Sequence, residues 1–280
     1  MKAAGYSALT GVKRLRGRLV ESLRDTPLWR PLRAAFQGIA PLWRNRLVRS
    51  AAFALRRPLY TADPRGYWQR EGGRRYLEDE AHILGPGSLS ERQGEFLAGA
   101  LGALGVASAL EVGAGYGRLL GELGRRLPAR LCGADFSEPQ LRMAREYLGA
   151  ATPPLVLADA TRGLPFRAAS FDAVYTQGSL MHVPPPGDRA YRAELARIAR
   201  RFVVHTEDVQ ETESTFAHDN AGHYRELGMR VVRDELYPLN MPGQRMRFQV
   251  FEHPVAAPAA SPTPGAPGAP PDGLARGSVA

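Results

Sequence analysis

A strand, a glycine turn and a helix follow one another between residues 107 and 127, and this order constrains the fold more than any other feature. The apolar run Ala107–Val112 predicts a strand, and Leu119, Leu120, Leu123 and Leu127 share one face of a helix. Gly113–Gly117, with glycine at every second position, forms the turn between them. Because a second strand is predicted at Leu131–Ala134, these residues form a βαβ unit with two parallel strands.

The same alternation continues along the chain. Ser90–Gln93 has the spacing of a capping box and predicts the start of the preceding helix. Further strands are predicted at Leu155–Ala158, Phe171–Thr176 and Phe202–His205, with helices between them, and the β-rich runs Met229–Tyr237 and Met246–His253 follow without an intervening helix. We therefore predict an α/β fold, Rossmann-like and doubly wound, with a mostly parallel sheet and an antiparallel edge hairpin.

Charge divides the chain into regions. The chain has 37 Lys and Arg and 28 Asp and Glu. Residues 1–60 contain 13 of the basic and 2 of the acidic residues, a net charge of +11, so the remaining residues have a net charge of −2. Leu9, Val12, Leu15, Leu19 and Leu23 lie at helical spacing among these arginines. We predict a basic amphipathic helical extension over 1–60, the main domain over 61–253, and a disordered Pro/Ala/Gly-rich tail over 254–280.

Several classes of protein are excluded by composition. A single cysteine, Cys132, allows neither an intramolecular disulfide nor a thiolate metal cluster. Arginines interrupt every apolar stretch of the N-terminal region, so none reaches the roughly 18 apolar residues of a spanning helix. The uncharged stretch Ala3–Val12 precedes the basic cluster, which is the reverse of a secretory signal. We expect a cytoplasmic protein, in which residues 1–60 either contact the inner membrane face peripherally or pack on the main domain as a helical lid.

Three carboxylates follow the ends of three successive predicted strands. Glu111 lies two positions before the first glycine of the turn, Asp135 ends the second strand, and Asp159 follows the third. The carboxyl edge of a parallel sheet is where open α/β folds bind ligands. Gly-x-Gly-x-Gly differs from the dinucleotide-binding spacing, and an acid before it disfavours a pyrophosphate. The pattern favours a cationic or zwitterionic ligand.

Residues 101–253 resemble the class I S-adenosylmethionine-dependent methyltransferases, and the segments 164–166, 170–174 and 180–183 are similar to the small-molecule branch of that family. The resemblance implies that S-adenosyl-L-methionine is the cofactor and that no metal is needed. It places the glycine turn under the methionine part, Asp135 on the ribose, Phe136 against the adenine, and Asp159 with Ala160 at the adenine edge. The expected cofactor-binding set is Glu111, Gly113, Gly115, Gly117, Asp135, Phe136, Asp159, Ala160 and Gln177.

Histidines after the fourth and fifth strands are the candidates on the acceptor side. His182 is the candidate general base, because imidazole titrates near neutral pH, and its alternative role is a hydrogen-bonded residue of the helix-entry turn. His205, Glu207, His218, Asp219 and His223 cluster in sequence, on what we expect to be a loop covering the substrate. We interpret them as a polar substrate pocket, with a divalent metal site or a solvated loop as alternatives.

The sequence therefore predicts methyl transfer to a small-molecule, glycan or lipid-linked acceptor, most simply at oxygen. One alternative is an RNA-binding methyltransferase that binds phosphates through the arginine-rich extension over residues 1–60. Nucleic acid is disfavoured because the extension also carries tryptophan and leucine on apolar helix faces, and because residues 176–179 lack the Asn/Asp-Pro-Pro-aromatic run of base-amine methylation. A second alternative is a module that binds the cofactor without catalysis.

Overall fold

The computed structural model describes residues 56–241 and 243–254. The predicted tail, and all of the predicted extension except residues 56–60, lie outside the described residues. In the part of the chain that is described, no helix is both long and apolar enough to span a membrane.

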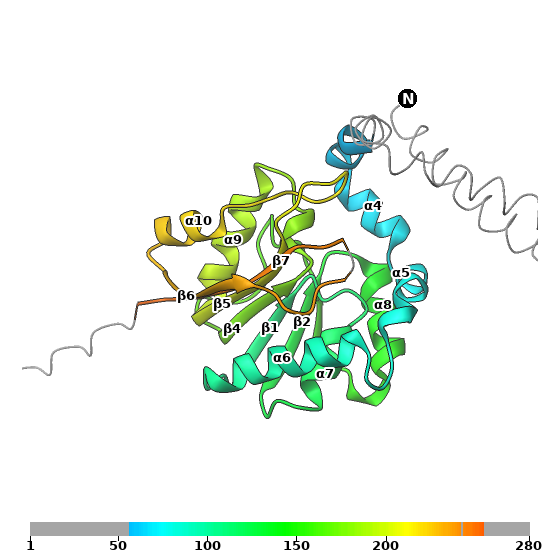
Figure 1. The fold of residues 1–280 in the computed structure, drawn as a ribbon, viewed down its shortest axis with the longest axis horizontal. Helices are drawn as coiled ribbons and strands as arrows, with labels where there is room; N and C mark the ends of the chain where they lie inside the picture. The colour runs from blue at the N-terminus through cyan, green and yellow to red at the C-terminus, as the bar shows by residue number, and fades with distance from the viewer. Residues whose placement is uncertain (1–55, 242, 255–280) are drawn as a thin grey trace, which may run out of the picture.

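A seven-stranded sheet forms the centre of the domain, in the order β3-β2-β1-β4-β5-β7-β6 (Figure 1). The strands are β1 (Ser108–Val112), β2 (Arg130–Asp135), β3 (Leu155–Leu157), β4 (Phe171–Gln177), β5 (Ala199–Asp208), β6 (Arg230–Leu236) and β7 (Met246–Glu252). The first five pair in parallel, whereas β7 pairs antiparallel with both β5 and β6. The predicted doubly wound α/β fold, with its antiparallel pair at one edge, is confirmed.

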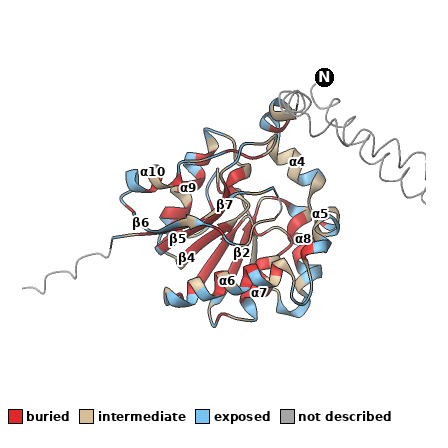
Figure 2. Cartoon of the chain, viewed as in Figure 1, coloured by how far each residue is buried: buried red, intermediate tan, exposed pale blue. Residues whose placement is uncertain are grey.

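Two hydrophobic cores cover the two faces of this sheet. One core contains residues of α6 (Leu89–Ala103) and α7 (Arg118–Gly124), and the other contains residues of α9 (Gly187–Ile198) and α10 (Asn220–Glu226). Neighbouring residues of β1 alternate between them, with Ala109 in the first and Leu110 in the second, as the period of a strand requires. Figures 1 and 2 show these helices on opposite sides of the buried strands.

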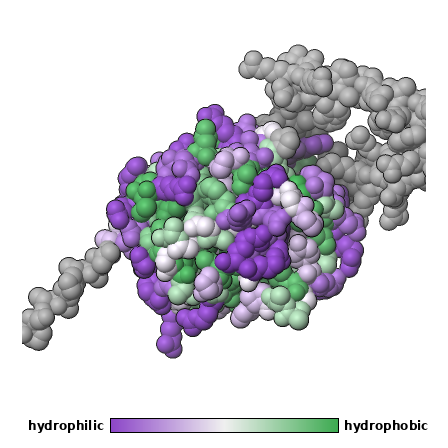
Figure 3. Space-filling model, turned by 60° about the horizontal axis from the view of Figure 1, so that its bottom comes forward, coloured by the Kyte–Doolittle hydropathy of each residue, from purple (hydrophilic) through white to green (hydrophobic). Residues whose placement is uncertain are grey.

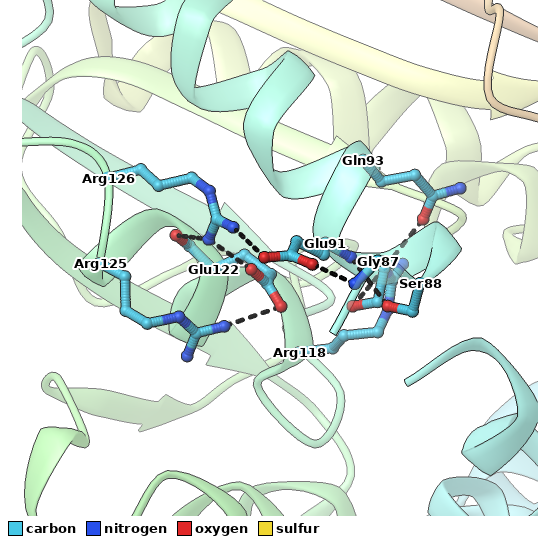
Figure 4. Close-up of polar contacts among 9 residues, drawn as sticks. Gly87, Ser88, Glu91, Gln93, Arg118, Glu122, Arg125 and Arg126 are labelled. Carbon is cyan, nitrogen blue, oxygen red and sulfur yellow. Dashed lines mark hydrogen bonds and ion pairs between the residues drawn. The ribbon is translucent and has the colours of Figure 1, made fainter. Parts of the chain in front are cut away.

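The amino end of α6 is tied to α7 by a polar network (Figure 4). The predicted cap at Ser90 is wrong, because the Ser88 side chain accepts from the Glu91 backbone N–H and the helix begins at Leu89. Glu91 and Glu122 both accept from Arg126, while Gln93 accepts from Arg118 at 2.8 Å. The network fixes Arg118, the first residue of α7, beside the glycine turn.

Residues 56–83, which we name the cap, precede α6 and cover the carboxyl edge of the sheet. The cap contains a helical segment over 56–62, α4 (Pro64–Glu71), α5 (Arg74–Glu80) and the short η1 (Ala81–Ile83). Two hydrogen bonds hold it to α8 (Glu138–Leu148) and the residue before it: Ser137 Oγ donates to the Trp68 carbonyl, and the Gly73 N–H donates to Gln140 Oε1. The cap therefore packs onto the domain.

Candidate active site

A cavity of about 430 Å³ lies between the cap and the carboxyl ends of the parallel strands. The walls contain nine of the ten predicted site residues, namely Glu111, Gly113, Gly115, Asp135, Phe136, Asp159, Ala160, Gln177 and His182. Gly117 is not among the lining residues. Strands that end at one sheet edge thus bring together residues spread over 72 positions of the chain.

The three glycines of the turn meet three different needs. At Gly113, with φ +78°, a Cβ would lie 2.0 Å from Ser179 Oγ, so the backbone passes too close for any side chain. At Gly117, with φ +81°, a Cβ would lie 2.7 Å from Leu148 Cδ1, so glycine there permits α7 to pack on α8. At Gly115, with φ +55°, a Cβ would meet nothing nearer than Gln140 Nε2 at 3.8 Å. Gly115 alone leaves open space in the cavity.

The Asp135 carboxylate is fixed at the end of β2 by two backbone donors. Its Oδ2 accepts from the Gly115 N–H at 2.9 Å, and its Oδ1 accepts from the Ser137 N–H at 2.8 Å. Burial, opposed by these hydrogen bonds, raises its pKa to about 6, with the Asp159 charge adding to the rise. Each oxygen still has a lone pair for a further donor, so this carboxylate can accept from two hydroxyls of a ligand.

Glu111 lies deeper, beneath the glycine turn. It is 3% exposed, and its Oε2 accepts from the Tyr175 hydroxyl at 3.1 Å. Burial raises its pKa to about 8, although the Tyr175 hydrogen bond and the Arg118 charge oppose the rise. A buried carboxyl of this kind becomes ionised when a cation binds beside it. The floor of the cavity is thus suited to a ligand that carries positive charge.

Asp159 joins the floor of the cavity to the cap. Its Oδ1 accepts from both the backbone N–H and the hydroxyl of Thr161, at 2.9 and 2.7 Å. Its Oδ2 accepts from Arg65 Nη1 of α4 at 2.8 Å. The Arg65 guanidinium carbon also lies 5.6 Å from the centroid of the Phe136 ring. One cap residue therefore contacts both groups expected at the adenine.

The cap supplies a roof of aromatic side chains that the sequence analysis missed. Trp68 and Tyr76 line the cavity, with ring centroids 5.5 Å apart, and the buried Tyr60 packs behind them. The Trp68 Nε1–H donates to the Tyr60 hydroxyl, which in turn donates to the His182 carbonyl at 2.7 Å. A cluster of four aromatic residues within positions 60–76 is the one signal that could have indicated this roof.

His182 ends η3 (Leu180–His182), immediately after β4 and its turn. Its Nδ1 lies 2.8 Å from the Ser214 carbonyl, and since a carbonyl only accepts, Nδ1 carries the proton and Nε2 has the free lone pair. Burial lowers its pKa to about 4. The ring is therefore neutral at pH 7, with a fixed tautomer, at the edge of the cavity.

The five polar residues after the fifth strand do not line this cavity. His205 and Glu207 lie within β5, where His205 contacts Thr176 and Tyr224 and Glu207 accepts from the Met181 N–H. His218 contacts the Leu180 carbonyl, and Asp219 caps α10. The expected polar substrate pocket is therefore wrong, because none of the five lines the cavity: Glu207 and His218 contact the 178–182 turn, and Asp219 and the buried His223 belong to the start and the interior of α10. Among the described residues no group of three His, Cys, Asp or Glu could hold a metal ion.

A second cavity, of about 60 Å³, adjoins the first. The two share Tyr76, Glu80, Arg118, Gln177, Gly178 and His182. Gln177 Nε2 donates to Gln93 Oε1, whereas Gln177 Oε1 is buried and finds no partner within the described ranges. A buried acceptor without a partner at the junction of two cavities indicates a place for a ligand donor.

Comparisons with known proteins agree with this geometry. Residues 109–201 match a family model described as a methyltransferase domain. Magnesium protoporphyrin IX methyltransferase from Synechocystis PCC 6803, solved with bound SAM, is 16% identical, with 72% of this chain and 97% of that chain covered and a TM-score of 0.52. An S-adenosylmethionine-dependent methyltransferase from Clostridium acetobutylicum is 8% identical, with 64% and 97% covered and a TM-score of 0.52. The cyclase SpnF is 17% identical, with 59% and 81% covered and a TM-score of 0.51.

Proposed function

We propose that this chain, in which residues 109–201 match a methyltransferase domain, is a class I S-adenosylmethionine-dependent methyltransferase that transfers a methyl group to a small-molecule, glycan or lipid-linked acceptor at oxygen. One observation carries the proposal: the carboxylates at the ends of three successive strands line a single cavity with the glycine turn. Ligand binding at this edge is what the topology of an open α/β sheet provides.

The residues present fit the cofactor. Glu111 and the turn at Gly113 and Gly115 would hold the methionine end, and the neighbouring Arg118 would pair with its carboxylate. Asp135 would accept from the ribose hydroxyls, Phe136 would lie against the adenine, and Asp159 with Ala160 would hold the adenine edge. The room above Gly115 and the raised pKa of Glu111 both support a ligand that brings a cation to this floor.

The sulfonium group, when bound, supplies an activated methyl, so the protein has to align the acceptor, exclude water and accept a proton. Trp68 and Tyr76, which line the cavity from the cap, would keep water from the reacting groups. His182 would accept the proton of the acceptor hydroxyl at Nε2, because its Nδ1–H is held by the Ser214 carbonyl. Gln177 lines the cavity, and its buried Oε1, which has no partner among the described residues, would accept a hydrogen bond from the acceptor or from the cofactor amine.

Calorimetry with S-adenosylhomocysteine, followed by transfer of labelled methyl to a panel of alcohols, phenols, amines and glycans, tests the proposal. We expect micromolar binding, and label on hydroxyl-bearing compounds only. Label on amines alone would contradict the choice of oxygen. Binding without transfer to any compound would favour a module that binds the cofactor without moving its methyl.

A second proposal concerns location. We infer that residues 1–60 hold the protein at the cytoplasmic face of an anionic membrane, because a +11 balance is interleaved with Trp29, Trp43 and leucines. On the face of the described domain in Figure 3, hydrophilic and hydrophobic residues are intermixed, so the extension is the better candidate for a surface contact.

Sedimentation of the full chain with vesicles, either neutral or containing a third of anionic lipid, tests this location. The full chain should bind only anionic vesicles, less at high salt, and Lys13→Gln with Arg14→Gln, Arg16→Gln and Arg18→Gln should weaken binding at least tenfold, since each basic residue near the surface contributes about 1 kcal/mol. Equal binding by both chains, or selective binding to RNA, would contradict it.

A further inference from the structure

Arg65 is in the first turn of α4, outside the residues that match the methyltransferase family model. Its guanidinium pairs with Asp159 at 2.8 Å and lies over Phe136 at 5.6 Å, and all three side chains line the cavity. Asp159 Oδ1 accepts from two donors of Thr161, and Arg65 binds the other oxygen, Oδ2. The arginine is thus placed where a base would lie.

We propose that Arg65 is a further cofactor-binding residue, whose planar guanidinium contacts the adenine that Phe136 and Asp159 hold. The inference rests on the proposed function, because it takes the adenine to lie against those two residues. Arginine suits the role, since its guanidinium stacks on flat rings while its N–H groups remain paired with a carboxylate.

The cap presents Arg65 from a fixed position. The Asp63 side chain caps α4 through the Gly66 N–H at 2.7 Å. Gln69 Nε2 donates to the Phe136 carbonyl at 3.0 Å, and Ser137 Oγ donates to the Trp68 carbonyl at 3.1 Å. The helix is thereby tied to the same turn, 136–137, that follows the ribose-binding Asp135. The adenine site is consequently completed by a helix that precedes the matched domain.

The ion pair itself contributes little to folding. The Arg65 side chain is 43% exposed, and a pair with one half-exposed partner stabilises a protein only weakly. Replacing Arg65 should therefore leave the fold intact. The chain also offers a matched control on the same helix, because Arg70 Nη1 lies 3.2 Å from Asp63 Oδ2, its side chain is 41% exposed, and it is not among the residues that line the cavity.

Calorimetry of the full chain with S-adenosylhomocysteine tests the proposal. We expect Arg65→Gln to weaken affinity about tenfold, in the range of a lost charge-assisted contact, and Arg70→Gln to change it by less than about twofold. The melting temperatures of both variants should stay near that of the wild type. Wild-type affinity in Arg65→Gln would overturn the inference, whereas absence of binding by the wild-type chain would instead overturn the proposed function.

Arg65→Lys separates contact with the base from an indirect effect through Asp159. Lysine keeps the ion pair but lacks the planar group that stacks on a ring. If Arg65 contacts the adenine, Arg65→Lys should weaken S-adenosylhomocysteine binding about three- to fivefold. Affinity equal to that of the wild type in Arg65→Lys would mean that only the charge matters, and the proposed contact would be wrong.

Discussion

The floor of the cavity, which contains Glu111, Asp135 and Asp159, and its roof, which is formed by aromatic residues of the cap, are built in different ways. On the floor, Glu111, Asp135 and Asp159 occupy their places because each lies at or just beyond the end of a strand, close in sequence to the element that positions it. The roof depends on contacts between distant segments, such as the hydrogen bond from the Tyr60 hydroxyl to the His182 carbonyl, 122 positions away. The floor is therefore set by the fold itself, and the roof by a few side-chain contacts.

This difference has an energetic side. Burial raises the pKa of Glu111 to about 8 and that of Asp135 to about 6, so the floor holds carboxylates in an environment that disfavours their charge until a cation arrives. Several contacts between the cap and the domain are exposed or half-exposed and cost little to break. We expect the floor, together with Arg65 of α4, to determine how tightly the cofactor binds, and the aromatic roof to influence how fast it enters and leaves.

His182, where roof and floor meet, gives the largest expected effect. His182→Ala should lower kcat by roughly 10²–10⁴ if Nε2 takes the acceptor proton, with cofactor affinity little changed. Because its pKa is lowered to about 4, the ring is unprotonated above pH 5 and His182 should add no pH dependence to kcat between pH 6 and 8. A change in kcat below about threefold, measured with an identified acceptor, would assign His182 a structural role in holding the 214 loop.

Asp135 gives the next largest effect, and an aspartate at the opposite edge of the sheet, outside the cavity, is its control. Asp135→Ala should weaken S-adenosylhomocysteine binding by about 1.5–3 kcal/mol, through loss of charge-assisted hydrogen bonds. Asp172, near the start of β4, accepts from the Ser108 hydroxyl at Oδ2 and lies away from the cavity. Asp172→Ala should therefore bind S-adenosylhomocysteine with wild-type affinity. Equal calorimetric affinities for wild type and Asp135→Ala would remove the ribose assignment.

Glu111 tests whether a buried carboxyl on the floor lowers the free energy of unfolding when no cation is bound. Its pKa is higher in the folded chain than in the unfolded chain, so the folded state binds more protons and stability falls as the pH rises from 4.5 to about 8. Urea unfolding at pH 6 and pH 8.5 should show the wild type losing about 1–2 kcal/mol more than Glu111→Gln, which keeps an acceptor for Tyr175. Parallel losses in the two proteins would mean that Glu111 is already ionised at pH 6.

The sequence was sufficient for the fold because each signal was local. Alternating burial, glycine turns and helix faces placed all seven strands, and the largest errors were at the two ends of β5, which spans Ala199–Asp208 where Phe202–His205 was predicted. The floor was equally accessible, because Asp135 and Asp159 are recognised from the strands they follow. Gly117 could not be distinguished from Gly113, since only the structure shows that one accommodates Leu148 and the other Ser179.

The roof and the acceptor side could not be predicted, for a physical reason. Arg65 is held at the cavity by its ion pair with Asp159, 94 positions later, and nothing near Arg65 in the sequence specifies that partner. The proximity of His205, Glu207 and His218 in sequence was misleading in the opposite sense, because two of them lie inside a buried strand. Likewise Ser88, and not Ser90, caps α6 because of the path of the preceding turn, in which the Gly87 N–H donates to the Glu91 carboxylate.

The smallest expected effect comes from one hydroxyl of the roof. Tyr60→Phe removes the acceptor of the Trp68 Nε1–H and the donor to the His182 carbonyl, which should cost about 1 kcal/mol of stability. If the roof controls passage of the cofactor, the dissociation rate of S-adenosylhomocysteine should rise about threefold, as followed by Trp68 fluorescence in stopped flow. Tyr237→Phe is the matched control, since the Tyr237 hydroxyl is buried without a partner among the described residues and its removal should be neutral or stabilising. A dissociation rate in Tyr60→Phe equal to that of the control would mean that the roof, like the floor, is a fixed part of the fold.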